Sequence, residues 1–155
     1  MDRTYGNIID LYHVKNSLES YRPVIQSSDN LQISATNAAV IAFIYYKKND
    51  LCVLLNKRSQ LVEHHKGEIS FPGGVMDYTD KSILDTALRE AEEEMGIQPA
   101  HVDIVSQLSS VITRTNFIIT PFVGIIPEAY TFNINKEEID QILEIPLTNL
   151  IKQLE

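Results

Sequence analysis

The hydrophobic and polar positions between residues 83 and 95 follow a helical period. Apolar side chains recur there at steps of three and four: Ile83, Leu84, Ala87, Leu88, Ala91 and Met95. Ser82 stands where an N-cap is expected, and Asp85 three residues later makes an approximate capping box. Gly96 supplies a C-terminal stop. The pattern therefore predicts an amphipathic helix over residues 83–95.

Longer apolar runs predict strands on either side of this helix. The unbroken run at 37–47 is typical of a buried strand, and the polar turn after it leads into 51–58, which completes a hairpin. Residues 102–114 fit one strand or a bent pair. Residues 117–127 predict a further buried strand, interrupted at Pro121.

Three further segments have helical spacing. Residues 5–21 carry an apolar stripe that ends near Tyr21, before Arg22 and Pro23. Lys136–Glu144 fits a short helix or turn, and Leu147–Leu154 looks helical. No repeats or interdomain linkers occur, so residues 1–155 are expected to form a single domain. This order of elements predicts an α+β fold, with an α/β/α sandwich on a mixed β-sheet.

Composition and charge limit the possible binding partners and the cellular location. The chain has 155 residues, 44% of them hydrophobic, and a net charge of −8, which argues against nucleic acid as the main partner. There is no apolar run of about 18 residues and no charged-then-apolar leader, so we expect no membrane span and no signal peptide. Cys52 is the single cysteine, which excludes an internal disulfide and favours a cytoplasmic location.

Carboxylates gather on the polar side of the predicted helix. Glu90, Glu93 and Glu94 lie at i, i+3 and i+4, which places them on neighbouring turns. A solvated acidic face is the ordinary interpretation of such a run. Arg89 nearby can fix one carboxylate, and the paired glycines Gly73–Gly74 allow a backbone carbonyl to approach. A site made only of oxygen ligands would favour Mg²⁺ or Mn²⁺ over zinc.

The stretch from Gly73 to Ile97 resembles the signature of the Nudix hydrolases, G-x5-E-x7-R-E-U-x-E-E-x-G-U, where U is a bulky apolar residue. The second half, REAEEEMGI, fits every fixed position except that Ala91 is small. In the first half, the position of the signature Glu falls on Lys81 when counted back from Arg89, and on Asp80 when counted forward from Gly74. The first half therefore indicates a one-residue expansion.

With this extra residue, the stretch resembles the corresponding segment of the coenzyme A pyrophosphatase branch of the family, which has the pattern GGKxDPxDxSLxxTALREAxEEIG. The run TALREA matches, as do Asp77, Asp80 and Ser82. That branch adds LLTxRSx3Rx3Gx3FPGG upstream, and this chain has LLNKRSQLVEHHKGEISFPGG. Three positions depart from the branch: Asn56 replaces a Thr, Glu63 replaces an Arg, and Val75 stands where a Lys is common.

The resemblance implies roles for the clustered side chains. Glu93 and Glu94 are expected to bind the metal directly, and Glu90 to act as a ligand or as the base. The Gly74 carbonyl would complete the ligand shell, and Arg89 would fix a carboxylate.

Other implied roles lie outside the helix. Glu138 stands where the branch has a further carboxylate, although a surface charge is an equal alternative. Arg58, Lys66 and the Gly73–Gly74 backbone are expected to bind a small-molecule nucleotide substrate.

Three functions stay open at this point. The first is hydrolysis of coenzyme A or its thioesters to 3′,5′-ADP and phosphopantetheine. The second is hydrolysis of another nucleotide pyrophosphate, such as ADP-ribose or a nucleoside triphosphate. The third is a catalytically silent nucleotide-binding module, which the intact REAEEE run disfavours. Members of the branch continue for several tens of residues past the IPLTNL segment, so we also expect a sheet edge that a homodimer partner could cover.

Overall fold

A computed structural model describes residues 9–26 and 34–153 of the chain. In this part of the chain eight strands form one mixed sheet. The strands are β1 (Thr36–Lys47), β2 (Asp50–Arg58), β3 (Ile69–Ser70), β4 (Gly73–Val75), β5 (Asp103–Gln107), β6 (Val111–Ile112), β7 (Phe117–Ile125) and β8 (Ile139–Pro146). The helices are α1 (Leu11–Ser20), α3 (Ile83–Met95), the short 3-10 helix η1 (Pro99–His101) and α4 (Leu147–Lys152).

The long strand β1 lies at the centre of the sheet. It pairs antiparallel with β2 and β4 and parallel with β7, and β7 in turn carries β5 and β6. β8 pairs antiparallel with β2. Because β1 has neighbours on both sides and helices over both faces, its sequence is an almost unbroken apolar run.

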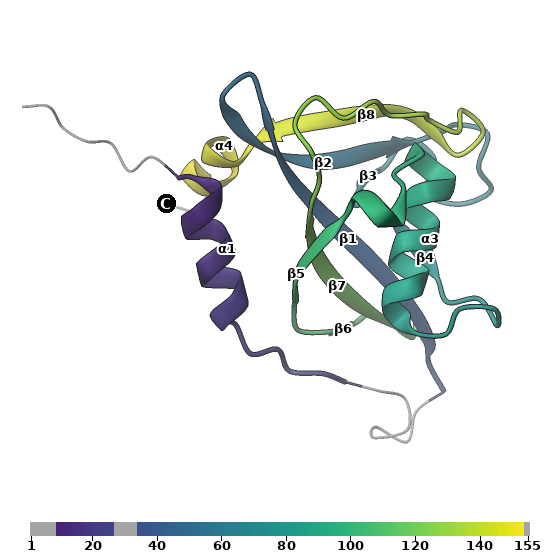
Figure 1. Ribbon diagram of the computed structural model, residues 1–155. Helices are drawn as coiled ribbons and strands as arrows, with labels where there is room; N and C mark the ends of the chain where they lie inside the picture. The colour runs from purple at the N-terminus through teal and green to yellow at the C-terminus, as the bar shows by residue number, and fades with distance from the viewer. Residues whose placement is uncertain (1–8, 27–33, 154–155) are drawn as a thin grey trace, which may run out of the picture.

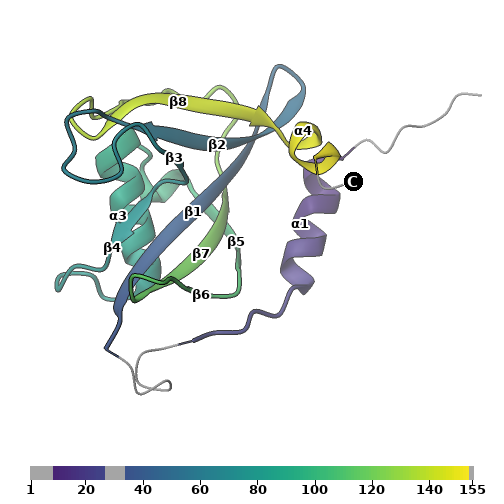
Figure 2. The ribbon, with the colours of Figure 1, turned by 180° about the vertical axis from the view of Figure 1, so that it is seen from behind.

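Helices cover both faces of the sheet, as Figures 1 and 2 show from opposite sides. Strand alternation sends Ile41, Phe43 and Tyr45 into the core beneath α3. Ile44 points to the other face, where α1 and α4 pack with residues such as Val14. The predicted α/β/α sandwich on a mixed sheet is confirmed.

Helix α3 forms as its sequence pattern predicts. It runs from Ile83 to Met95, and the Ser82 hydroxyl accepts a hydrogen bond from the Asp85 backbone N–H at 3.1 Å. Gly96 ends the helix in the left-handed region, with φ of 70°. Its apolar stripe packs on the sheet, which leaves the other side of the helix for charged residues.

The prediction of a short helix or turn over Lys136–Glu144 is wrong for most of that segment. The turn is confined to residues 136–138, and Ile139–Pro146 form strand β8 along the length of β2. The helical spacing of Ile139, Ile142 and Leu143 was misleading because most of this segment pairs with β2 in an antiparallel ladder. Whether a second copy of the chain covers the β8 edge stays a prediction.

Other boundaries differ in smaller ways. Residues 102–114 form the bent pair β5 and β6, but Pro121 does not interrupt β7. The Pro121 carbonyl accepts a bond from Leu108 in the β5–β6 connection, so its missing N–H falls in a gap of that ladder. α1 begins only at Leu11, after the N-cap Asp10. Residues 5–8 of the first predicted helix and residue 154 of the last lie outside the described residues.

Candidate active site

Two glycines bring strand β4 against helix α3. Gly73 has φ of +155°, and a Cβ there would lie 2.1 Å from the Ala39 carbonyl oxygen of β1. A Cβ on Gly74 would lie 2.5 Å from the carboxyl carbon of Glu90. The carboxylate of Glu90 therefore rests directly on the Gly74 backbone, at a distance that only glycine permits.

Three carboxylates meet beside these glycines. Glu90 and Glu94 come from successive turns of α3, and Glu138 comes from the turn just before β8. One carboxylate oxygen from each lies within 4.8 Å of the others. We refer to Glu90, Glu94 and Glu138 as the carboxylate cluster. Glu138 is 44 positions downstream of Glu94, and it reaches α3 because it directly precedes β8, which pairs with β2.

Burial makes the cluster electrostatically unfavourable without a cation. Glu94 is only 2% exposed, and this burial raises its pKa to about 8. Burial also raises the pKa of Glu90, although the Arg89 guanidinium opposes that shift. Three hard oxygen donors of like charge in a partly buried setting fit Mg²⁺ or Mn²⁺, which prefer carboxylate oxygens.

Arg89 forms a second ionic group on the same helix. Its Nε and one terminal nitrogen donate to the two oxygens of Asp80 at 2.9 and 3.0 Å. It also contacts Glu90 at 2.9 Å, Glu93 at 3.2 Å and the Val75 carbonyl at 3.1 Å. These five bonds saturate the guanidinium, so its geometry is that of a fixed structural cation.

The family follows from a comparison with known domains. Residues 35–153 match the model of the NUDIX domain. The chain belongs to the Nudix family. It is 41% identical over 100 residues to the uncharacterized Nudix hydrolase NudL of Yersinia enterocolitica, and 39% identical over 115 residues to NudL of Photorhabdus laumondii. Those matches cover 64% and 74% of this chain but only 51% and 61% of the relatives, so the chain spans little more than half of their length.

Solved Nudix structures share the fold. A C. elegans Ap4A hydrolase in a binary complex superposes with a TM-score of 0.62 at 16% identity, covering 76% of this chain and 85% of that one. The NUDIX domain of Shewanella oneidensis NrtR, crystallised with ADP ribose, gives 0.59 at 18% identity, covering 88% and 85%. At these identities the likeness establishes the fold alone.

The Nudix helix places Glu93 differently from the other two glutamates. Its side chain is 52% exposed and contacts Arg89, and it is not one of the three residues that make up the carboxylate cluster. The predicted ligands Glu90 and Glu94 do come together, with Glu138 as the third. Metal binding by Glu93 or by the Gly74 carbonyl stays a prediction.

The expected substrate-binding residues lie on β2, on β4 and in the loop between β2 and β3. Arg58 ends β2, and its charge lowers the pKa of Glu94. Its Nε is buried without a hydrogen-bond partner among the described residues. Lys66 is exposed in the loop between β2 and β3. The Gly73 N–H donates to Glu94 at 3.2 Å, so this donor is already engaged.

Two polar residues beside Glu94 were not predicted from the sequence. Asn56 is fully buried on β2, and its Nδ2 donates to Glu94 Oε2 at 3.4 Å. Ser70 of β3 donates to Asn56 Oδ1 at 2.8 Å. The signal was present, because a fully buried amide within the apolar run LCVLLNKR requires polar partners.

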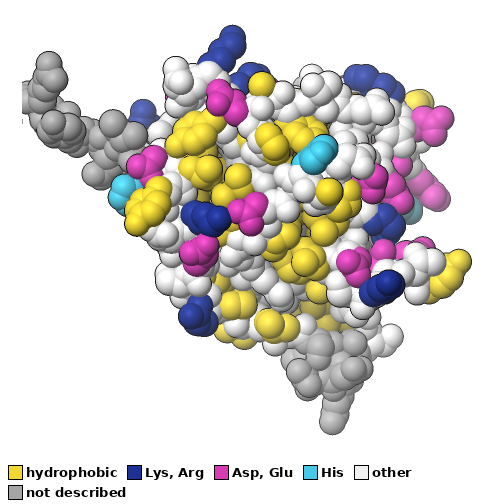
Figure 3. All heavy atoms as spheres, viewed as in Figure 1, with side chains coloured by type: hydrophobic (Ala, Val, Ile, Leu, Met, Phe, Trp, Pro, Cys, Tyr) yellow, Lys and Arg dark blue, Asp and Glu magenta, His cyan; other side chains and the backbone are white. Residues whose placement is uncertain are grey.

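The surface around the site is charged. In Figure 3 acidic and basic side chains gather over α3 and the loop that precedes it, whereas hydrophobic side chains lie between α3 and α1. No helix within the described residues has both the length and the apolar character needed to cross a membrane.

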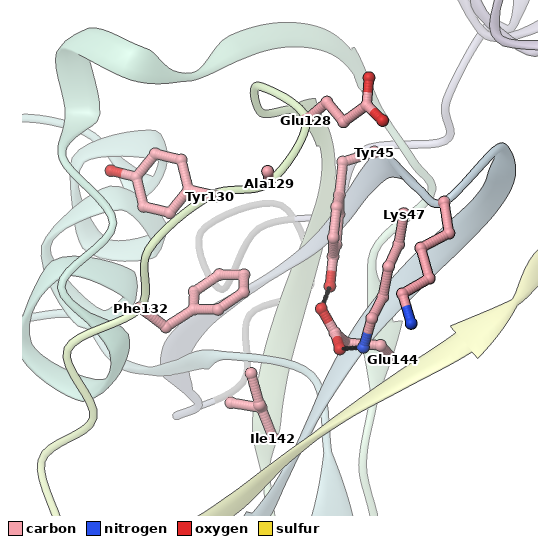
Figure 4. A pocket seen from close by; sticks show the side chains of 9 residues that line it. Tyr45, Lys47, Glu128, Ala129, Tyr130, Phe132, Ile142 and Glu144 are labelled. Carbon is pink, nitrogen blue, oxygen red and sulfur yellow. Dashed lines mark hydrogen bonds and ion pairs between the residues drawn. The ribbon is translucent and has the colours of Figure 1, made fainter.

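A separate pocket of about 470 Å³ lies toward the other end of β8. Figure 4 shows Tyr45, Tyr130 and Phe132 on its walls, and Glu144 bonded to both Tyr45 and Lys47. Glu144 stands six residues beyond Glu138 along an extended strand, so this pocket is distant from the carboxylate cluster.

Proposed function

We propose that the chain is a divalent-metal-dependent pyrophosphohydrolase that cleaves nucleoside diphosphate derivatives. The observation that carries this proposal is the carboxylate cluster, since a Nudix domain with three convergent, partly buried carboxylates has a place for Mg²⁺ or Mn²⁺. A silent binding module gains nothing from carboxylates that oppose one another and raise the cost of folding.

The residues of the site have different roles in this proposal. Glu90, Glu94 and Glu138 would hold the cation. When bound, it neutralises diphosphate oxygens and lowers the pKa of the attacking water. Arg89 fixes Glu90 through a 2.9 Å bond, and Gly74 lets that carboxylate approach the strand. Whichever of the carboxylates accepts the proton of the water acts as the general base.

The finer proposal is that the substrate is coenzyme A or an acyl-coenzyme A, cleaved to 3′,5′-ADP and 4′-phosphopantetheine. The upstream pattern from Leu54 to Gly74 supports this, because it contains Arg58, whose charge acts on Glu94 of the cluster. A charge-assisted bond from Arg58 to the 3′-phosphate of coenzyme A would contribute about 1.5–3 kcal/mol. The buried, unpartnered Nε of Arg58 fits a guanidinium kept for a ligand.

A second candidate is another nucleotide diphosphate such as ADP-ribose. Two basic positions of the coenzyme A pattern are occupied here by Glu63 and Val75, which removes cations that would hold the extra phosphate.

A product assay separates these candidates. The panel contains coenzyme A, 3′-dephospho-coenzyme A, ADP-ribose, Ap4A and a nucleoside triphosphate, each with Mg²⁺ and with Mn²⁺. We expect kcat/KM for coenzyme A to exceed that for the dephospho form about tenfold or more. Arg58→Ala should reduce that preference, whereas Lys57→Ala should keep it, because Lys57 is the neighbouring cation on the opposite side of β2. Faster cleavage of ADP-ribose than of coenzyme A would refute the coenzyme A assignment and leave the general activity standing.

A further inference from the structure

Asn56 is the most deeply buried polar side chain that faces helix α3 from the sheet. It lies in β2 between the apolar Leu54 and the site residue Arg58, on the same side of the strand as both. Burying an amide without hydrogen bonds costs about 2 kcal/mol or more, so its partners determine how it is oriented. Those partners lead from Ser70 to the carboxylate cluster.

The Ser70 hydroxyl and the Glu94 carboxylate together determine which way the amide points. Ser70 Oγ donates to Asn56 Oδ1 at 2.8 Å, and its own β3 backbone is held in register because Ser70 pairs with Asn56 across the ladder. A hydroxyl can either donate or accept, whereas an ionised carboxylate only accepts, so Nδ2 is the end of the amide that faces Glu94 and Oδ1 takes the Ser70 hydroxyl. Reversing the amide would place two acceptors, Oδ1 and the Glu94 carboxylate, against each other.

Both donors that reach Glu94 end on the same oxygen. Asn56 Nδ2 lies 3.4 Å and the Gly73 N–H 3.2 Å from Oε2. Oε1 takes no part in these two bonds. Both donors therefore hold by a single oxygen the carboxylate that meets Glu90 and Glu138 in the cluster.

We propose that Asn56, held by Ser70, is a positioning residue that orients Glu94 for binding a divalent cation. This inference rests on the proposed function, because it assigns a partner to one of its metal ligands. Side chains that orient a metal ligand typically contribute a factor of 10–100 in metal affinity. Ser70 acts through Asn56 and should therefore have the smaller effect.

The test is the dissociation constant of Mn²⁺, measured without substrate by electron paramagnetic resonance of free Mn²⁺. We expect binding by Asn56→Leu, which fills the space but cannot donate, to be about 10–100-fold weaker than in the wild type. Ser70→Ala should weaken binding several-fold, and Ser70→Thr, which keeps the hydroxyl, should restore wild-type affinity. Ser110→Ala is the matched control, because Ser110 is also buried and bonded to a side chain but lies on the segment beside β7.

Melting temperatures of the metal-free proteins distinguish positioning from simple packing. A purely structural role would lower the melting temperature of the variants and leave the Mn²⁺ affinity unchanged, which would overturn the inference while the proposed function stands. If Asn56→Leu does not fold, the pair Ser70→Ala and Ser70→Thr decides the question, and equal affinity in both overturns the inference. Failure of the wild type to bind Mn²⁺ would overturn the proposed function and this inference together.

Discussion

Two groups of carboxylates contact helix α3, and they differ in what neutralises their charge. The Asp80 side chain is only 4% exposed, although the residue as a whole is partly buried, and Glu94 is buried at 2% exposure. Yet the Arg89 guanidinium holds the pKa of Asp80 well below its usual range, whereas burial raises the pKa of Glu94 to about 8. The difference has two causes: Glu94 is the more deeply buried of the two, and a cation of the chain lies against Asp80 whereas none donates to Glu94 among the described residues.

This contrast separates a structural site from a functional one. The chain neutralises the Asp80–Arg89 group with its own charge, so that group stabilises the fold under all conditions in which both partners are ionised. The carboxylate cluster opposes folding when no cation is bound. Glu90 belongs to both groups, since it bonds Arg89 and rests on Gly74 beside Glu94. Through Glu90 the structural group fixes the geometry of the functional one.

The largest expected effect comes from removing the charge of Glu94. Glu94→Gln keeps the shape but loses a ligand charge, so turnover should fall about a thousandfold or more. The melting temperature of the metal-free protein should stay the same or rise, because a buried amide costs less than a buried carboxylate. Glu92→Gln, on the exposed side of the same helix, is the control for both measurements. Wild-type turnover in excess chelator would contradict the assignment.

A smaller effect is expected from crowding Glu90. The Cβ of Gly74→Ala would lie 2.5–2.8 Å from the Glu90 carboxyl atoms, which must move away from the cluster. We expect activity to fall about 10–100-fold with a modest loss of stability. Gly73→Ala should do the reverse and mainly destabilise the fold, because its Cβ would meet the backbone of β1 at 2.1 Å. Melting temperature and kcat of the two variants, measured side by side, test this; equal behaviour would contradict it.

The sequence was most informative where a pattern is local. Helix α3, its cap Ser82 and its stop Gly96 depend on neighbours within a few residues, and all three form as predicted. The segment Lys136–Glu144 was predicted wrongly because its strand conformation depends on β2, which lies some 80 residues earlier in the chain. Local spacing contains no information about such a partner.

The same limit applies to the site. Helical spacing brings Glu90 and Glu94 together, and family resemblance suggested Glu138, which the β8 pairing then places beside them. The spacing did not reveal that Arg89 would bind Asp80, which lies outside the helix in the preceding loop. Nor did it reveal that Asn56 would face Glu94, since that contact joins two elements whose relative position is set by the core.

The smallest expected effect concerns the neutralised group and its dependence on pH. Asp80→Asn removes the charge that Arg89 binds, so it should cost about 2 kcal/mol of unfolding free energy at pH 7. That loss corresponds to a fall of about 4–8 °C in melting temperature for a chain of this size. Mn²⁺ affinity should change far less than in Glu94→Gln, because the carboxylate cluster stays intact.

The pH dependence follows from the lowered pKa of Asp80. Its carboxyl titrates near 3.8 in the unfolded chain and at lower pH in the folded protein, mainly because of the hydrogen bonds from Arg89. The stabilisation is therefore complete above about pH 5, and it is lost as the pH falls from there through the folded pKa. Melting curves of the wild type and Asp80→Asn should differ by a constant amount from pH 5 to 8 and should converge below pH 4. Asp140→Asn, at an exposed position of β8, should match the wild type throughout. A difference between wild type and Asp80→Asn that persisted undiminished at pH 2 would show that Arg89 does not stabilise the ionised carboxylate, and the contrast with Glu94 would fail.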